Sequence, residues 1–344
     1  MRQRTGSEWI TRSTILFAAL LTTHAAHADV TIQLSPQGQT YAMQLGIDPA
    51  ELETQLEGKI TDVFQLANIN GMLRGFTDAT SFSARGIGVD YASDPKSALF
   101  GVAANVAAAG DFRDKDRPTG GIAASIALMA GLNLSAWNHP RWTVYANGFY
   151  QGGSTDQLEG KITCLGAHVQ YQIIPPSESG GTGAVVRWLG LSANSGIEFT
   201  RWSLGAGSDG VLSDFEIAGN GEDQAITYDA TGRFDLTSTA TTVPVEVTTG
   251  LRIALIAAVY VGAGVDVTVG KSTIATGLSG PLRAGDMEIG TASISASGSN
   301  SASPASARAL AGVQLNLWKL KLFAQANASM IPAVSFGLGA RLVF

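Results

Sequence analysis

Histidine, serine and cysteine could supply nucleophilic or metal chemistry, but their spacing here builds no known catalytic motif. After the first 28 residues the chain has two histidines, His139 beside Pro140 in a turn-like stretch and His168 in "KITCLGAHVQYQII". Cys164 is the only cysteine, and the sequence has no G-x-S-x-G elbow, H-E-x-x-H pair or Walker loop. We therefore expect no enzyme, no metal site and no cofactor.

A second set of residues could act inside a channel. His168 alternates with Cys164, Gly166 and Gln170, which places it on the small, polar face of a strand. The same reasoning gives the predicted lumen residues as His168, Glu198, Arg252, Asp266, Arg308 and Arg341. The charges could form a constriction that selects solutes. They could equally pair with one another and fill a closed barrel, and a lone histidine could simply be satisfied by neighbouring amides.

Persistent alternation with period two predicts the strands that must position these residues. In "GIAASIALMAGLNLSAW" one face carries Ile122, Ile126 and Leu128, and the other carries small and polar residues. A soluble β-sandwich, the alternative, would cover its second face with charged residues. Here that face carries Gly, Ala, Ser, Asn and Gln, which favours an enclosed lumen and a lipid-facing exterior.

Composition supports a membrane barrel. Charged residues make up 15% of the chain, against about 25% in ordinary soluble domains. Past the amino terminus no stretch approaches the roughly 18 consecutive apolar residues of a transmembrane helix. We predict an all-β fold, a transmembrane antiparallel β-barrel of about 12 to 14 strands over residues 81–344. Aromatic residues such as Trp142, Tyr150, Trp188, Trp202 and Trp318 are expected near strand ends.

Residues 1–28 have the features of a signal peptide. Arg2, Arg4 and Arg12 precede the apolar run "TILFAALL", and "AHA" provides a cleavage site after Ala28. Removing three basic residues from 22 and one acidic residue from 28 leaves 19 and 27, a net charge of −8. An acidic exported chain has no electrostatic basis for binding nucleic acid.

Residues 29–80 differ in character and contain one predicted helix, over residues 48–69. Asp48 is its expected N-cap, Pro49 its first residue and Glu51 the partner in a capping box. This segment is predicted to be either a periplasmic helix at the barrel mouth or a plug in the lumen. The alternation also suggests a first strand over residues 82–92, running inward. If the first strand runs from the extracellular side toward the periplasm, the chain must first cross to the extracellular side. Either an unseen strand or a chain threading the lumen would provide that crossing.

The polar stretches 111–120, 151–160, 204–223 and 297–306 are predicted to be extracellular loops, and shorter turns are expected at the periplasmic end.

The carboxyl-terminal sequence "VSFGLGARLVF" resembles the terminal signature of Gram-negative outer-membrane β-barrel proteins, through Gly339, Leu342 and Phe344. That resemblance implies outer-membrane lipid and the barrel-assembly machinery as partners. The segment before the barrel resembles the hatch of the long-chain fatty-acid transporter family. No "NPAG"-like motif follows residues 78–82, so no ligand residue is transferred from that family.

The sequence leads to two functional hypotheses for an outer-membrane protein. The first is a channel or transporter for passive uptake of small hydrophobic or weakly polar molecules, based on a lumen with few charges and a hatch-like segment. The alternative is a non-transporting structural or adhesive barrel that acts through its extracellular loops.

Overall fold

The computed structural model describes residues 24–65, 69–93, 95–110, 120–155, 157–177, 185–219, 222–254 and 256–344. These residues form a single antiparallel sheet of twelve strands, as the alternation predicts. Ten of the twelve close a ring, because β7 pairs with β8 as well as with β6. The ring strands are β2 (Ala98–Ala109), β3 (Gly121–Leu134), β4 (His139–Ser154), β5 (Leu158–Ile174), β6 (Val186–Gly219), β7 (Glu222–Ile253), β8 (Ala257–Ala284), β10 (Ala305–Leu317), β11 (Leu320–Ser329) and β12 (Ala333–Val343).

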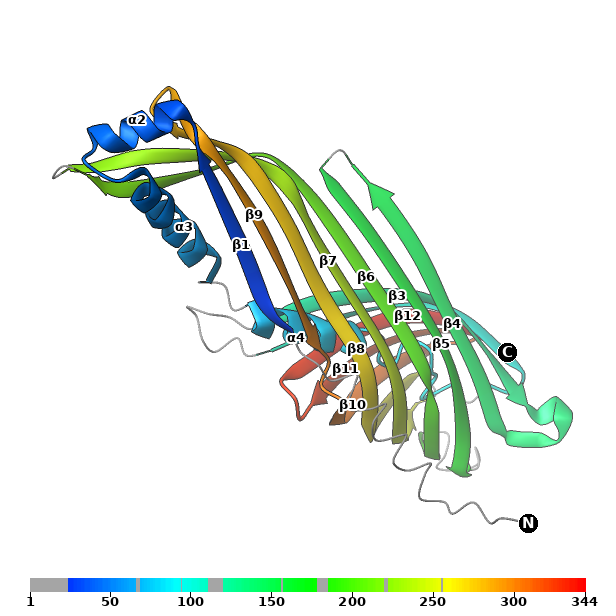
Figure 1. Cartoon of the computed structure of the whole chain (residues 1–344). Helices are drawn as coiled ribbons and strands as arrows, with labels where there is room; N and C mark the ends of the chain where they lie inside the picture. Colours follow the sequence, from blue (N-terminus) through cyan, green and yellow to red (C-terminus); the bar gives the residue numbers. More distant parts are fainter. Residues whose placement is uncertain are drawn as a thin grey trace, which may run out of the picture.

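The ring continues into a tall curved sheet on one side, which we call the extension (Figure 1). Up to Val267, β8 pairs with β10; from Lys271 onward it pairs with β9 (Met287–Ser301) instead. β9 in turn pairs with β1 (His24–Leu34). The extension consists of β1, β9, residues 207–219 of β6, 222–239 of β7 and 271–284 of β8. Every strand of the extension lies at the end of the barrel opposite Phe344.

Two helices cover the inner face of the extension. α2 (Pro36–Gln44) begins after Ser35, whose Oγ accepts a hydrogen bond from Gly38 N at 3.1 Å. α3 (Pro49–Gln65) follows the predicted cap, and Asp48 Oδ1 accepts from Ala50 N at 2.9 Å. Their apolar sides pack with the strands into one core, which includes Ala42, Leu52, Leu56, Ile226, Tyr228, Leu282, Ile289 and Ile294. The extension therefore has a hydrophobic core of its own.

A third helix, α4 (Ile69–Phe82), lies inside the upper part of the ring and contacts several of its strands (Figure 1). The sequence predicted only one of these three helices. Residues 83–93 contain no strand, so the predicted strand over 82–92 is wrong. The first ring strand begins at Ala98, not near residue 81.

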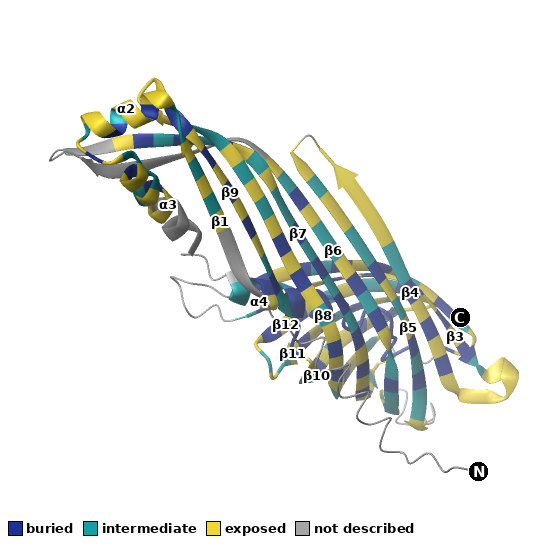
Figure 2. Ribbon diagram, viewed as in Figure 1, coloured by how far each residue is buried: buried dark blue, intermediate teal, exposed yellow. Residues whose placement is uncertain are grey.

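Exposed and buried residues alternate along the ring strands (Figure 2). The outward residues form an apolar belt that includes Val102, Val106, Ile126, Leu128, Val245, Val261, Val265, Val313, Phe336 and Leu338. Trp137, Trp142, Trp188, Trp318 and Phe344 are exposed near the lower end of the ring, where the chain terminates. Trp202 instead points inward, and its ring lies edge-on to Phe76 of α4. An apolar belt with aromatic residues along its lower edge is typical of a lipid-facing surface.

The predicted polar loops are mostly strand. Residues 151–154 and 158–160 belong to β4 and β5, residues 204–219 belong to β6, and residues 297–301 belong to β9. Residues 111–119 lie outside the described part of the chain. The low hydrophobicity that suggested loops arises because these strands extend beyond the apolar belt. Within the described residues no helix has both the length and the hydropathy needed to span a membrane.

Candidate functional site: the filled lumen

The chain threads the ring from one end to the other. It descends from the extension through α4, and residues 77–93 are buried throughout. At the lower end, Lys96 N and Ser97 N donate hydrogen bonds to Phe344 O at 3.2 and 3.0 Å, and β2 then begins at Ala98. Of the two routes that the sequence left open, an unseen strand or a chain threading the lumen, the described residues follow the second, although the inward strand over 82–92 that prompted them is absent. We call α4 together with residues 83–93 the plug.

Two glycines allow this segment to pass close to the barrel wall. Gly86 has φ +76°, a left-handed conformation that favours glycine. A Cβ atom on Gly88 would lie 2.3 Å from Asn147 Oδ1 and 2.6 Å from His168 Nε2. The plug therefore fits against the wall without space for even one added carbon at residue 88.

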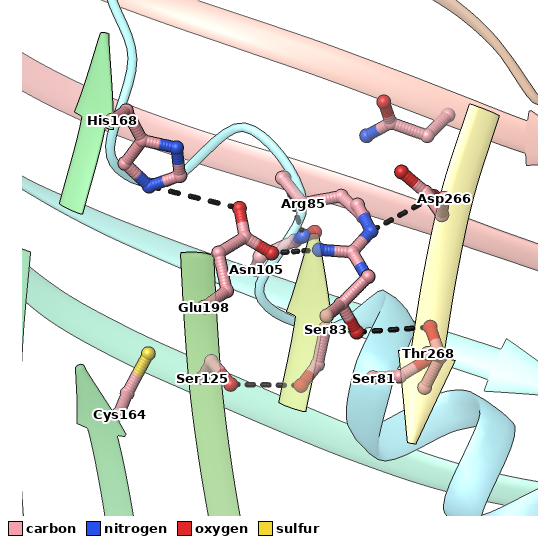
Figure 3. A network of polar contacts seen from close by, with 12 residues as sticks. Ser81, Ser83, Arg85, Asn105, Ser125, Cys164, His168, Glu198, Asp266 and Thr268 are labelled. Carbon is pink, nitrogen blue, oxygen red and sulfur yellow. Dashed lines mark hydrogen bonds and ion pairs between the residues drawn. The ribbon is translucent and has the colours of Figure 1, made fainter. Parts of the chain in front are cut away.

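Arg85 of the plug lies between two carboxylates of the barrel wall (Figure 3). Its Nε donates to Asp266 Oδ2 at 3.0 Å, and its Nη1 pairs with Glu198 Oε2. The backbone oxygen of Arg85 accepts from Asn105 Nδ2 at 3.1 Å. The side chain is 1% exposed, so these charges compensate one another away from water, as buried ions require.

Asp266 extends this pairing to a second arginine. Arg308 Nε lies 3.1 Å from Asp266 Oδ2, Arg308 Nη2 pairs with Glu246 Oε2, and Arg308 Nη1 donates to Asn327 Oδ1 at 3.0 Å. One carboxylate therefore joins an arginine of the plug to an arginine of β10.

A third arginine holds the lower part of the plug. Arg341 Nη1 lies 3.0 Å from Asp90 Oδ1, and Nη2 donates to Val89 O at 2.7 Å. The guanidinium also stacks over the ring of Phe323, 3.7 Å from its centroid. Asp90 Oδ1 accepts from Ala92 N and Ser93 N at 3.0 Å, so the same carboxylate shapes the turn of the plug.

Hydroxyl groups hold α4 at the upper end of the lumen. Thr77 Oγ1 donates to Ser272 Oγ at 2.7 Å, and Ser83 Oγ lies 2.7 Å from Ser125 Oγ. Asp78 accepts from both the backbone nitrogen and the hydroxyl of Ser303, at 2.7 and 2.9 Å. Ser303 lies in the short break between β9 and β10. α4 is therefore fixed where the extension joins the ring.

Five of the six predicted lumen residues lie buried inside the barrel: His168, Glu198, Asp266, Arg308 and Arg341. His168 Nε2 is 3.2 Å from Asn147 Oδ1 and 3.8 Å from Glu198 Oε1. The sixth, Arg252, is half-buried near the lower end of β7 and pairs in register with Arg187 and Ala258.

Sequence reasoning missed three residues that form ion pairs in the lumen: Arg85, Asp90 and Glu246. Glu246 had a usable signal, because Val243, Val245 and Val247 alternate with it and face outward. The two plug residues had none, since their segment was read as a strand. These ion pairs form two groups: Arg85 and Arg308 with Glu198, Glu246 and Asp266, and Arg341 with Asp90. Their geometry suits closure of the lumen.

The three residues of the carboxyl-terminal signature lie on β12 or directly after it. Leu342 and Phe344 are exposed on the outer surface. Gly339 faces inward, where a Cβ atom would lie 2.3 Å from the ring of Phe323. The fold is thus that of the outer-membrane barrels that the signature resembles.

Several solved structures resemble this chain at low identity. The outer membrane protease OmpT from Escherichia coli is 8% identical with a TM-score of 0.38, covering 74% of this chain and 99% of that one. A Pseudomonas aeruginosa FadL homologue is 9% identical with a TM-score of 0.24, covering 80% and 100%. The attachment invasion locus protein Ail of Yersinia pestis is 12% identical with a TM-score of 0.21, covering 72% and 99%. No activity or residue is carried over from any of them.

Sequence comparison identifies the family. No curated protein matches the chain. The family model described as Lsa36-like matches residues 25–344, which includes the extension, the plug and every ring strand. The chain therefore belongs to the Lsa36-like family.

Proposed function

We propose that this protein is a closed, non-transporting outer-membrane barrel that acts through the extension it displays outside the cell. The observation that supports this most directly is the buried plug, whose Arg85 is ion-paired to two wall carboxylates. A diffusion pore needs a continuous polar passage, and residues 77–93 occupy that space. The alternative that the sequence left open, mutual ion pairing in a filled barrel, has the better support.

The orientation is part of the proposal. Tight turns join β3 to β4, β7 to β8 and β10 to β11 at the end where Phe344 lies. Barrels of this class have short turns on the periplasmic side and larger structures outside. The extension, at the opposite end, is then extracellular. The export signal predicted to end at Ala28 would suit this location. Ala28 lies within β1, and cleavage after it would leave Asp29–Leu34 paired to β9.

The expected lack of enzymatic activity belongs to the same proposal. His139, at the start of β4, is exposed, whereas His168 is buried with its partners Asn147 and Glu198. A hydrolase needs its nucleophile and base on a surface that substrate reaches. Recognition by the barrel-assembly machinery is proposed from the exposed Leu342 and Phe344.

Planar-bilayer conductance tests the proposal. The chain from Asp29 onward should insert and remain silent, because the plug fills the ring. A chain lacking residues 29–93 should conduct, since the deletion removes both α4 and the segment that carries Arg85. Heat-modifiable migration on gels must show that both proteins are folded before conductance is compared.

Open channels in the undeleted chain would refute the closed barrel and restore the uptake hypothesis. Silence from a folded deletion variant would mean that wall side chains alone close the ring, which leaves the non-transporting function intact but removes the role of the plug.

A further inference from the structure

One row of side chains crosses the outer surface at the upper margin of the apolar belt. The pairing register aligns Thr163 of β5 with Arg201 of β6, Arg201 with Thr239 of β7, Thr239 with Lys271 of β8, and Lys271 with Ser301 of β9. Neighbours on the same strands, Cys164, Thr200, Ser238 and Ser272, are buried in the lumen. All five members of the row therefore face outward, and we call them the hydroxyl–cation row.

The row coincides with a change in surface chemistry. The next outward residues toward the lower end include Leu165, Phe199 and Val269, which belong to the apolar belt. The next row toward the extension carries Lys161, Ser203, Thr237, Thr273 and Ser299. Two residues along a strand span about 7 Å. The cations therefore lie about 7 Å along the strands from the nearest outward residues of the apolar belt.

Other charges nearby are already paired, whereas the two cations of the row are not. Glu159 pairs with Lys161 at 2.5 Å and with Arg233 at 3.1 Å, and Arg233 also pairs with Asp235 at 2.9 Å. In the described part of the chain, neither Arg201 nor Lys271 forms an ion pair, and both are exposed. They sit two strands apart, about 10 Å, with the hydroxyl of Thr239 between them.

We propose that the hydroxyl–cation row binds the phosphate groups of an anionic lipid in the outer leaflet. A guanidinium and an ammonium flanked by hydroxyls offer the donors that phosphate oxygens accept, and arginine binds phosphate through a two-pronged contact. Basic residues beside a membrane-spanning surface are attracted to anionic headgroups. The acyl chains of the same lipid would cover the belt below the row. Naming the outer leaflet rests on the orientation proposed above.

Native mass spectrometry of the full chain, folded in a neutral detergent, tests this with lipid A as the probe. Each cation near an anionic lipid surface contributes about fivefold to affinity, so Arg201→Gln with Lys271→Gln should weaken lipid A binding about 25-fold. Arg283→Gln, which removes an exposed outward charge near the tip of the extension, should leave binding unchanged. Inorganic phosphate at the same concentration should not compete, whereas phosphatidylglycerol should compete weakly.

Equal binding by the double variant and the unchanged chain would overturn the proposal. An equal loss in Arg283→Gln would overturn it too, because the effect would then reflect net charge. Full competition by inorganic phosphate would show a site for free anions and refute the lipid. This assay measures lipid binding and the bilayer experiment measures conductance. An open pore would therefore refute the closed barrel without affecting the proposed lipid site.

Discussion

Replacing Arg85 by Met should release the plug from its wall without unfolding the barrel. Met retains the unbranched apolar stem but removes the charge that compensates Glu198 and Asp266. Removing one partner of a buried ion pair costs about 3–5 kcal/mol, because the remaining charge is left uncompensated. Asp266 keeps Arg308 as a partner, which places the expected cost at the lower end, about 3 kcal/mol. The backbone hydrogen bonds between the ring strands do not involve Arg85 and should be unaffected.

Hydrogen exchange over residues 83–93 measures this directly. The amides of Arg85 and Ile87 donate to Phe82 O and Ala84 O at 3.3 and 3.4 Å and report on plug opening. A loss of about 3 kcal/mol corresponds to a roughly 100-fold rise in the open population, since 1.4 kcal/mol is tenfold. Arg233→Met, which breaks exposed pairs with Glu159 and Asp235, is the matched control and should leave these amides unchanged. Adding Glu198→Gln to Arg85→Met should restore part of the protection. Unaltered exchange in Arg85→Met would refute the view that Arg85 holds the plug.

Two further outcomes follow from packing and burial. Gly88→Val should displace the plug and speed hydrogen exchange over residues 83–93, because its Cβ would lie 2.3 Å from Asn147 Oδ1. Gly153→Ala is the control and should exchange like the unchanged chain, since no atom lies within 4 Å of the added Cβ. Equal exchange in the two variants would contradict the tight fit of the plug. Burial beneath the helices of the extension raises the pKa of Tyr228 above its usual value. The folded protein therefore favours the protonated phenol of Tyr228. The contribution of this preference to the free energy of unfolding is complete below about pH 10 and is lost as the pH rises through the pKa of Tyr228 in the folded protein. Absorbance at 295 nm should show a late ionisation step that Tyr228→Phe removes, and an unchanged titration curve in that variant would contradict the assignment.

The alternation of side chains predicted the ring because its physical cause is local. Each outward residue meets lipid and each inward residue meets the lumen, so Leu128 and Ser125 take opposite faces whatever the rest of the chain does. The same logic placed His168 and Arg308 inside. The helix at Asp48 was also predictable, since a cap and a first-turn proline act over a few residues.

The plug could not be predicted in this way. Residues 82–92 alternate in hydrophobicity, yet they are enclosed on all sides. An alternation of period two therefore does not show here that the segment is a strand with one face toward lipid. Arg85 is buried only because Glu198 and Asp266 arrive from distant strands. The extension was missed for a related reason. Beyond the belt, the outer face meets water, so residues such as Thr273 and Ser279 replace the aliphatic ones and the pattern resembles loops.

The enclosed segment is held differently at its two ends. At the lower end it continues covalently into β2, which pairs with β12 to close the ring. At the upper end it leads to α2, α3 and β1, which are held to β9 and the rest of the extension by strand pairing and apolar packing. Withdrawing α4 and residues 83–93 through the ring therefore requires the pairing of β1 with β9 and the core of the extension to separate first. Opening of the Lsa36-like barrel is consequently coupled to the stability of its extension.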